Sequence, residues 1–189
     1  MTRIAIVDPQ PAARAGLAML LRTEPGLVPV GIAAGVDEGA ALVALQRPDV
    51  VLLELHQGDG DGLALCRRLR ASELPPNVIL YTAAPEPVLG LLARVAGAAG
   101  LVDKEAQPSE LFEAIRAVAR GGTALPRLDV AELDAAAHRV SPDDLALLAM
   151  LADRTSPADA ADALRLDERR LGRRIERLLG QLRARPVAA

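Results

Sequence analysis

Four polar residues suited to phosphoryl chemistry each lie at the end of a short apolar run of the sequence. In chain order they are Asp8 after RIAIV, Glu54 after DVVLL, Thr82 at the end of NVILYT, and Lys104 after GLVD. A carboxylate can act as a nucleophile or help to hold Mg²⁺, and a hydroxyl and an ammonium group can bind the oxygens of a transferred phosphoryl group. If the runs are parallel strands, their carboxyl ends meet at one edge of the sheet, where open α/β folds place their sites.

Two interpretations of these four residues are open at this point. One is a buried ion pair between Glu54 and Lys104, with Asp8 and Thr82 as polar lining. The other is a site that is, or descends from, a phosphoryl acceptor, and the coincidence of all four residues favours it.

The elements that would position these residues alternate between strand and helix five times. The predicted strands are 3–7, 27–33, 50–55, 77–82 and 100–103. The predicted helices are 12–22, 36–46, 61–71, 87–96 and 109–120. The connections are too short for anything but right-handed parallel crossovers. Residues 1–122 therefore predict an α/β domain with a doubly wound five-stranded parallel sheet.

Local signals refine this arrangement. The unbroken apolar run at 50–53 is typical of a strand buried on both faces. Pro29 and Gly31 indicate that the second strand lies at an edge of the sheet. We expect Ser109 to cap the last helix of the domain and Gly121 to end it.

A small all-α unit is predicted to follow. Residues 123–139 form the expected linker, with a short helical piece around 131–137. Three helices are expected in residues 140–189. The first starts after a Ser141 cap with Pro142 in its first turn, the second covers 157–164, and the third covers 168–182 after an Asp167 cap.

The last of these helices is strongly basic on one side. Residues 165–185 hold eight arginines and three acidic residues, a local net charge of +5 in a chain whose net charge is −3. The arginines that recur at helical spacing, opposite an apolar side, are Arg169, Arg170, Arg173, Arg174 and Arg177. Such a helix behind a tight turn is typical of a reader of the DNA major groove. The alternative is a solvated face in a sequence that uses 21 arginines and one lysine.

Composition limits which disulfides, membrane spans and metal sites the chain can form. The single cysteine, Cys66, excludes an internal disulfide, suits a reducing compartment and is expected to pack in the core. No apolar segment approaches the ~18 residues needed to span a bilayer, so we expect a cytoplasmic protein without membrane contact. His56 and His138 have no neighbours at metal-ligand spacing, and DGDG at 59–62 predicts a turn rather than a Ca²⁺ loop, so no metal site is expected.

These motifs, in this order, resemble those of bacterial response regulators. Residues 2–122, with IVDPQPAARAGLAMLL, RPDVVLLELHQGDGDGL, VILYT and GAAGLVDKEAQPSELFEAIRAVARGG, are similar to the receiver domain, which implies its flavodoxin-like fold. The whole chain resembles the NarL/FixJ type. Its segment SPDDLALLAMLADRTSPADAADALRLDERRLGRRIERLLGQL resembles the LuxR-type helix-turn-helix DNA-binding domain.

The resemblance implies roles for the basic helix and for the receiver surface. It implies base or phosphate contacts by Arg169, Arg170, Arg173 and Arg174, and a DNA backbone contact by Arg177. It also implies a fourth helix, for which the sequence after residue 182 shows no pattern, and a candidate dimer interface at 87–101 through Phe112.

The phosphorylation site departs from the family pattern. The phosphoacceptor aspartate falls on Glu54, the adjacent acidic pair on Asp8 and Pro9, and the switch aromatic on Leu101, while Thr82 and Lys104 are retained. Mg²⁺ requires near-octahedral oxygen ligation, which the loss of one acid weakens. A nucleophile misplaced by ~1 Å can lose ~10²-fold in rate. We therefore predict weak or absent Mg²⁺ binding and a receiver that is not gated by aspartyl phosphate.

The sequence thus predicts a transcriptional regulator that binds double-stranded DNA as a homodimer and is not an enzyme. An alternative is a receiver-based sensor that binds a protein or ligand and not DNA. It is suggested by Gly172, where the family often has a basic residue, and by the acidic Glu176 on the presumed DNA side. Either protein could take a small acidic ligand near Thr82 and Lys104 in place of phosphate. A third possibility is a regulator that is phosphorylated on Glu54.

Overall fold

The computed structural model describes residues 1–83 and 88–184. The chain forms two compact units. The sheet unit comprises Met1–Pro85 and Ala98–Leu125, and the helical unit comprises Glu86–Gly97 and Pro126–Ala189. This division differs from the predicted boundaries at 122 and 139, because part of the predicted α/β domain and most of the predicted linker belong to the helical unit.

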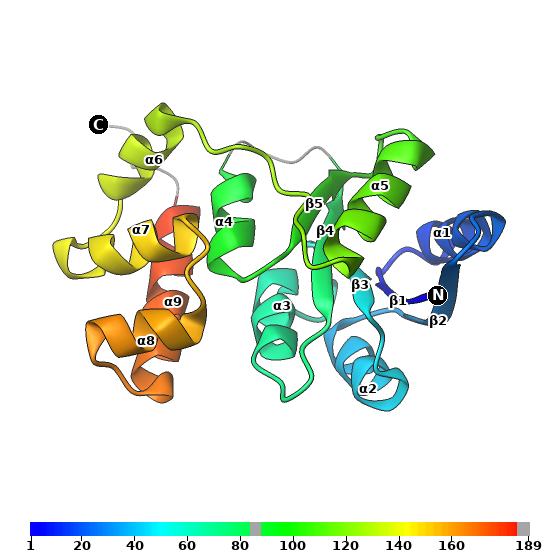
Figure 1. Cartoon of the computed structure of the whole chain (residues 1–189), viewed down its shortest axis with the longest axis horizontal. Coiled ribbons are helices and arrows are strands. Elements are labelled where there is room, and N and C mark those ends of the chain that lie inside the picture. Colours follow the sequence, from blue (N-terminus) through cyan, green and yellow to red (C-terminus); the bar gives the residue numbers. More distant parts are fainter. Residues whose placement is uncertain (84–87, 185–189) are drawn as a thin grey trace. The chain divides into compact units, whose positions relative to one another are not determined.

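A parallel sheet of five strands forms the centre of the sheet unit, as the alternating pattern predicts (Figure 1). The strands are β1 (Thr2–Val7), β2 (Leu27–Ala33), β3 (Val50–Leu53), β4 (Asn77–Thr82) and β5 (Gly100–Asp103). Their order is β2-β1-β3-β4-β5, so β2 is an edge strand as expected. Proline has no N–H to donate, and the register of β1 against β2 shifts beside Pro29. All four residues of β3 are buried, which confirms the prediction for the central apolar run.

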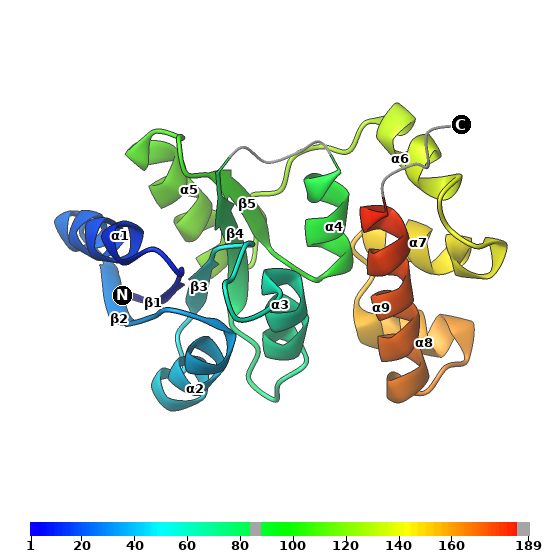
Figure 2. The same ribbon diagram turned by 180° about the vertical axis from the view of Figure 1, so that it is seen from behind.

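Helices cover both faces of this sheet (Figures 1 and 2). They are α1 (Pro11–Thr23) and α5 (Pro108–Ala119) on one face, and α2 (Val36–Gln46) and α3 (Gly62–Arg70) on the other. The core is aliphatic: residues such as Ile6, Leu52 and Ile115 pack between the sheet and the first pair of helices. Cys66 on α3 is fully buried, as predicted, and burial raises the pKa of its thiol to about 12 against the charges of nearby arginines.

Two aspartates in the loop after β3 fix helix ends. Both carboxylate oxygens of Asp59 accept from the Val36 N–H at 3.0 Å, and the Asp61 carboxylate accepts from the Leu63 N–H at 2.9 Å. The DGDG segment therefore caps α2 and α3, which agrees with the prediction of a turn.

Two predicted helix caps are wrong. Helix α5 begins at Pro108, and its N-cap, Gln107, makes no side-chain capping bond, so Ser109 lies inside the helix. After Ser141 the chain forms a 3-10 turn, η1 (Pro142–Asp144), and the Ser141 hydroxyl donates to the Asp144 carboxylate at 2.9 Å instead of capping. The predicted end of α5 is correct, with Gly121 at φ +80°.

The helical unit contains the remaining helices. They are α4 (Leu89–Val95), α6 (Val130–Ala137), α7 (Leu145–Ala152), α8 (Pro157–Leu164) and α9 (Glu168–Arg183). Asp167 caps α9 as predicted, because its carboxylate accepts from the Arg170 N–H at 2.8 Å. Helices α7, α8 and α9 pack against one another.

Helix α4 packs against α7 and α9, although it lies between β4 and β5 in the sequence. Its apolar residues Leu89, Leu91, Leu92 and Val95 are all buried, as expected for a helix that is apolar on every side. The Arg94 guanidinium donates to the Pro126 carbonyl at 2.7 Å, which ties α4 to the chain leading into α6. Because these side chains are buried, most of the predicted dimer interface at 87–101 is not available at the surface; residue 87 lies outside the described residues.

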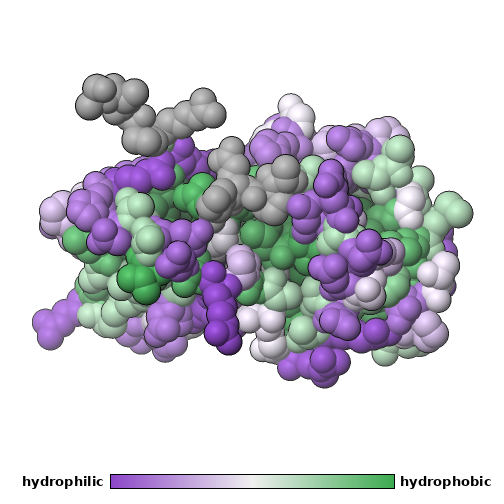
Figure 3. Space-filling view, turned by 90° about the horizontal axis from the view of Figure 1, so that it is seen from above, coloured by the Kyte–Doolittle hydropathy of each residue, from purple (hydrophilic) through white to green (hydrophobic). Residues whose placement is uncertain are grey.

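Hydrophilic and hydrophobic side chains are intermixed on the face drawn in Figure 3. Within the described chain, no helix combines the length and the apolar character that crossing a bilayer requires.

Candidate functional site

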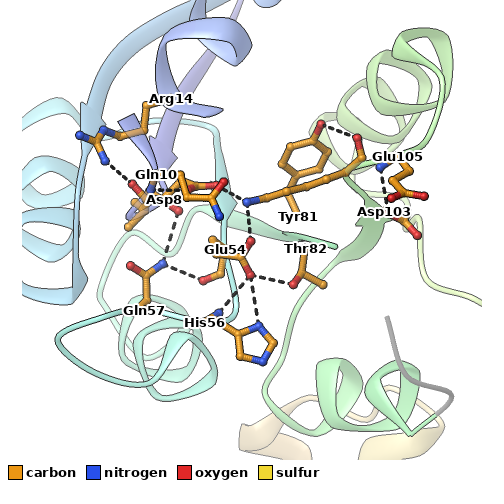
Figure 4. Close-up of polar contacts among 12 residues, drawn as sticks. Asp8, Gln10, Arg14, Glu54, His56, Gln57, Tyr81, Thr82, Asp103 and Glu105 are labelled. Atoms are coloured by element: carbon orange, nitrogen blue, oxygen red, sulfur yellow. Dashed lines mark hydrogen bonds and ion pairs between the residues drawn. The ribbon is translucent and has the colours of Figure 1, made fainter. Parts of the chain in front are cut away.

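The four residues predicted to form a site converge at the carboxyl edge of the sheet, and Figure 4 labels three of them, Asp8, Glu54 and Thr82. Asp8 follows β1, Glu54 follows β3, Thr82 ends β4 and Lys104 follows β5. Backbone pairing continues past the strand ends: the Glu54 N–H donates to the Val7 carbonyl at 2.8 Å, and the Lys104 N–H to the Thr82 carbonyl at 3.0 Å. We call Asp8, Glu54, Thr82 and Lys104 the carboxylate cluster.

Lys104 links the two acids of this cluster. Its Nζ lies 2.5 Å from Asp8 Oδ2 and 2.5 Å from Glu54 Oε2. The Thr82 hydroxyl donates to Glu54 Oε1 at 2.7 Å. Asp8, Glu54 and Thr82 are buried, and the Lys104 side chain is 15% exposed, so solvent screens these charges little. The cluster has the residue types of a phosphoryl site and the contacts of a closed ion-pair network.

The ion pairs keep both partners charged. Burial by itself would raise the pKa of Glu54, but hydrogen bonds from Lys104, Thr82 and the His56 N–H, with the Lys104 charge, lower it. Burial would likewise lower the pKa of Lys104, but its bonds to Asp8 and Glu54 and their charges raise it. Glu54 is therefore a carboxylate and Lys104 an ammonium ion at neutral pH.

Neighbouring loop residues that the sequence reading assigned no role here complete the cluster. The Gln10 N–H donates to Asp8 Oδ1 at 2.8 Å, and the Gln57 side-chain amide donates to the Glu54 carbonyl at 2.7 Å. The His56 N–H donates to Glu54 Oε1 at 3.0 Å, while its ring is 82% exposed. The only feature of the sequence that could have indicated these residues is their position just after a predicted strand. Which of their atoms meet the cluster depends on the conformation of the loop.

The two acids of the cluster, Asp8 and Glu54, are the candidate Mg²⁺ ligands, and both are bound by Lys104. Pro9 offers no side-chain oxygen beside Asp8, and the Lys104 ammonium group binds one oxygen of each carboxylate of the cluster. A hard divalent cation needs several oxygen ligands in near-octahedral geometry. Over residues 1–83 and 88–184, no group of three or more histidine, cysteine or acidic side chains is placed to hold a metal ion.

Leu101, at the switch position, lies in β5 and is partly buried. Its N–H donates to the Ala124 carbonyl at 2.9 Å, but its side chain has neither a ring nor a hydroxyl group. The aromatic residue beside the cluster is Tyr81, whose hydroxyl lies 3.5 Å from the Lys104 carbonyl. Burial raises the pKa of Tyr81 more than the Lys104 charge lowers it, so the phenol stays neutral.

Helix α9 is amphipathic, as the sequence predicts. Its buried side is formed by Leu171, Ile175, Leu178, Leu179 and Leu182. Arg169, Arg170 and Arg173 are exposed on the other side. Arg170 Nε lies 3.4 Å from the Asp167 carboxylate. In the described part of the chain no hydrogen bond or ion pair engages the side chains of Arg169 and Arg173.

The other two predicted DNA contacts bind a buried carboxylate of the helical unit. Asp144 is fully buried, and Arg174 Nε donates to its Oδ1 at 2.7 Å. Arg177 donates from Nε to Oδ2 at 2.8 Å and from Nη2 to Oδ1 at 3.0 Å. The bonds from Arg177, opposed by burial and helped by Arg174 and Ser141, lower the pKa of Asp144 to about 2. Sequence reading assigned Asp144 only to a helix start, because no local pattern connects it to residues about thirty positions later.

Comparisons with known proteins concern the family and the fold of the chain. Residues 4–116 match the family described as the response regulator receiver domain. The DNA-binding transcriptional activator DevR/DosR of Mycobacterium tuberculosis is 32% identical over 192 residues, covering 96% of this chain and 88% of that protein.

Two solved structures extend the comparison. A LuxR-family two-component response regulator from Aurantimonas sp. SI85-9A1 matches with a TM-score of 0.63 and 31% identity, over 66% of this chain and 89% of the other. RcsB of Salmonella enterica serovar Typhimurium, bound to promoter rprA, matches with a TM-score of 0.62 over 98% of this chain and 94% of the other. At 17% identity, this second match shows the fold alone.

Proposed function

Because the chain belongs to the response regulator family, we propose that it is a DNA-binding transcriptional regulator of the NarL/LuxR type whose receiver is not gated by aspartyl phosphorylation. The observation that carries the DNA-binding part is the exposed set Arg169, Arg170 and Arg173 on α9. The relative DevR/DosR, which aligns with 96% of the chain, is described as a DNA-binding activator.

The charge distribution supports binding through this helix. Neutralising DNA phosphates with arginine side chains releases counterions, so affinity depends on local positive charge rather than on the charge of the whole chain. The net charge of the chain is −3, but α9 concentrates its arginines on one side. Arg169 and Arg173 engage no other group in the described chain, so they are available to a duplex.

The carboxylate cluster supports the absence of phosphorylation gating. The would-be phosphoacceptor, Glu54, is bonded to Lys104, Thr82 and the His56 N–H, so a phosphoryl donor would have to displace these contacts. Pro9 removes the second acid that would help to hold Mg²⁺. The same contacts weaken the case for a small acidic ligand, which would have to compete with Glu54 for Thr82 and Lys104.

DNA binding is tested by retardation of sheared genomic DNA with the full chain. The untreated protein should bind with a strong salt dependence, and the double variant Arg169→Gln/Arg173→Gln should lose about two units of the salt slope. The variant Arg22→Gln/Arg120→Gln, on α1 and just after α5, removes the same charge elsewhere and should bind as the wild type. Wild-type protein that binds no fragment at low salt would favour the alternative of a sensor that does not engage DNA.

Gating is tested by adding acetyl phosphate or beryllofluoride with Mg²⁺ before the DNA measurement. Neither should change the affinity, and the intact mass of the protein should stay unchanged after acetyl phosphate. A gain of one phosphoryl group on Glu54, or a tenfold change in affinity, would contradict this part of the proposal.

We also propose a homodimer as the DNA-binding form, because helix-turn-helix proteins commonly read two half-sites one helical turn apart. Because α4 is buried, we do not assign the dimer contact to residues 87–101. Light scattering with and without a duplex distinguishes a dimer from a monomer that binds alone.

A further inference from the structure

Asp144 is a buried charge whose arginine partners come from another helix, α9. Four hydrogen bonds reach its two carboxylate oxygens, from Ser141, Arg174 and both Nε and Nη2 of Arg177. A fully buried carboxylate without such partners would be strongly unfavourable. The structural consequence is that two arginines of α9 are fixed by one side chain at the start of α7.

Arg174 and Arg177 differ in how much of the guanidinium group remains exposed. The Arg174 side chain is 20% exposed, and besides Asp144 it donates to the Asp143 carbonyl. The Arg177 side chain is 53% exposed, and its bonds to Asp144 use only the edge formed by Nε and Nη2. Its Nη1 has no partner within the described residues. A guanidinium group can donate from two edges, so the Nη1–Nη2 edge of Arg177 remains open to solvent.

Arg177 itself lies on the side of α9 that carries the exposed arginines. Arg170, Arg173 and Arg177 are separated by three and four residues, which aligns them along one side of a helix. A planar fork of N–H groups matches two oxygens of a phosphate.

From this geometry we infer that Asp144 is a positioning residue, which holds Arg177 on α9 with one edge engaged and the other presented to a DNA phosphate. The inference rests on the proposed function, since it assigns roles within the same DNA-binding helix. An arginine held in its binding geometry before the duplex arrives loses less side-chain freedom on binding, which strengthens the contact. Arg174, by contrast, serves the fold of the helical unit rather than the duplex.

The test compares two neighbouring acids in the full-length protein. Asp143→Asn and Asp144→Asn both remove one negative charge near α9, but only the carboxylate of Asp144 accepts hydrogen bonds from arginine side chains, since Asp143 is bound through its backbone carbonyl, which the substitution keeps. We expect Asp144→Asn to bind a labelled mixed-sequence DNA duplex about fivefold more weakly than Asp143→Asn, with a salt slope lower by about one unit. Equal affinity and slope for the two variants would overturn the inference.

A double-mutant cycle separates positioning from a general structural effect. In an Arg177→Gln background the difference between Asp143→Asn and Asp144→Asn should disappear, because its target is gone. In an Arg173→Gln background the fivefold difference should persist. A difference that survives in Arg177→Gln would show that Asp144 acts through the fold or through Arg174, and would overturn the inference.

Circular dichroism and thermal unfolding show whether each variant is folded. If Asp144→Asn is not, Arg177→Lys provides the same test, because one ammonium group cannot bind Asp144 and also present a second edge. We expect about a fivefold loss of affinity for Arg177→Lys, and wild-type affinity would overturn the inference. A wild-type protein that binds no duplex at all would contradict the proposed function itself. Equal binding by the two variants is a different outcome, which would contradict only the inference about Asp144.

Discussion

Lys104 is the only lysine of the chain, and its ammonium group contacts both acids of the carboxylate cluster. Without it, Asp8 and Glu54 would lie close together at a buried site without the ammonium group that both contact, and the two carboxylates would repel each other. Removing one partner of a buried pair is more destabilising than the net value of the pair, because the other charge remains.

We therefore predict that Lys104→Met lowers the free energy of unfolding at pH 7 by about 2 kcal/mol or more. Urea denaturation measures the change. The matched control is Arg68→Met, because Arg68 lies 3.8 Å from Asp37 with both side chains well exposed, and such pairs contribute about 0–1 kcal/mol. A Lys104→Met variant as stable as Arg68→Met would mean that the acids do not depend on Lys104.

The second residue-scale prediction concerns pH and Asp144. Its pKa is lowered from 3.8 to about 2, so its stabilising contribution is complete above pH 4 and is lost as the pH falls toward 2. Asp144→Asn should lower the free energy of unfolding by about 2 kcal/mol at pH 6, and this deficit should shrink by about half at pH 3. Asp143→Asn is the control, because its carboxylate makes no hydrogen bond or ion pair in the described residues and acts on Arg177 only through its charge, so it should show little of this trend. A deficit that is constant with pH would exclude the charge of Asp144 as its cause.

At this scale the sequence predicts the membership of the carboxylate cluster and, as one interpretation, the ion pair between Glu54 and Lys104, but not the other bonds of the cluster. Asp8, Glu54, Thr82 and Lys104 could be grouped because each follows a strand, and parallel strands bring their ends together. That Lys104 bridges both acids depends on side-chain conformations that no spacing encodes. The same limit applies to α9, whose amphipathic pattern is plain, whereas the capture of Arg174 and Arg177 by Asp144 arises only from packing between helices.

In the turn from β3 into α3, the backbone at Gly62 lies close to the backbone at Glu54 and Leu55. A Cβ atom on Gly62 would lie 2.6 Å from the Leu55 carbonyl oxygen and 2.7 Å from the Glu54 carbonyl oxygen. Both obstacles are backbone atoms, so relief would require moving the segment that holds Glu54. A glycine at this position therefore couples the start of α3 to the carboxylate cluster.

Gly62→Ala is accordingly predicted to lower the free energy of unfolding by about 1–3 kcal/mol, the usual range for overpacking. Gly58→Ala, in the same loop, meets no atom within 4 Å and should change stability by less than about 0.5 kcal/mol. Urea denaturation of both variants checks the contrast. Similar values for the two would show that the loop can shift freely away from Glu54.

Elements of the sheet unit follow from sequence more closely than those of the helical unit. The strands at 27–33, 77–82 and 100–103 have the predicted bounds, because apolar runs between turn residues have few other solutions. Helix α4 is found almost where predicted, but its packing partners are not the expected ones. A helix with apolar residues on every side carries no directional signal, so its sequence could not show which unit it joins.

Helix α4 matters for the whole molecule because the chain passes between the two units on either side of it. The chain leaves the sheet unit before α4, returns to it at Ala98, and leaves it again at Pro126. Helix α4 contacts α7 and α9, and a Cβ on Gly90 would lie 2.9 Å from Pro126 Cγ. The helical unit is therefore assembled from two separate pieces of sequence, one of which is attached at both ends to the sheet unit.

Cutting the chain between Leu125 and Pro126 should accordingly not release the C-terminal fragment under native conditions, because α4 stays with the sheet fragment while packing against α7 and α9. An inserted protease site at this point, followed by gel filtration, measures retention, and the cut chain in concentrated urea provides the separated reference. In the cut protein, Gly90→Val should weaken retention by forcing a side chain toward Pro126, whereas Gly16→Ala in α1, where nothing lies within 4 Å, should not. Two fragments that elute apart in native buffer would mean that residues 126–184 hold together without α4, and retention unaffected by Gly90→Val would assign the association to other contacts.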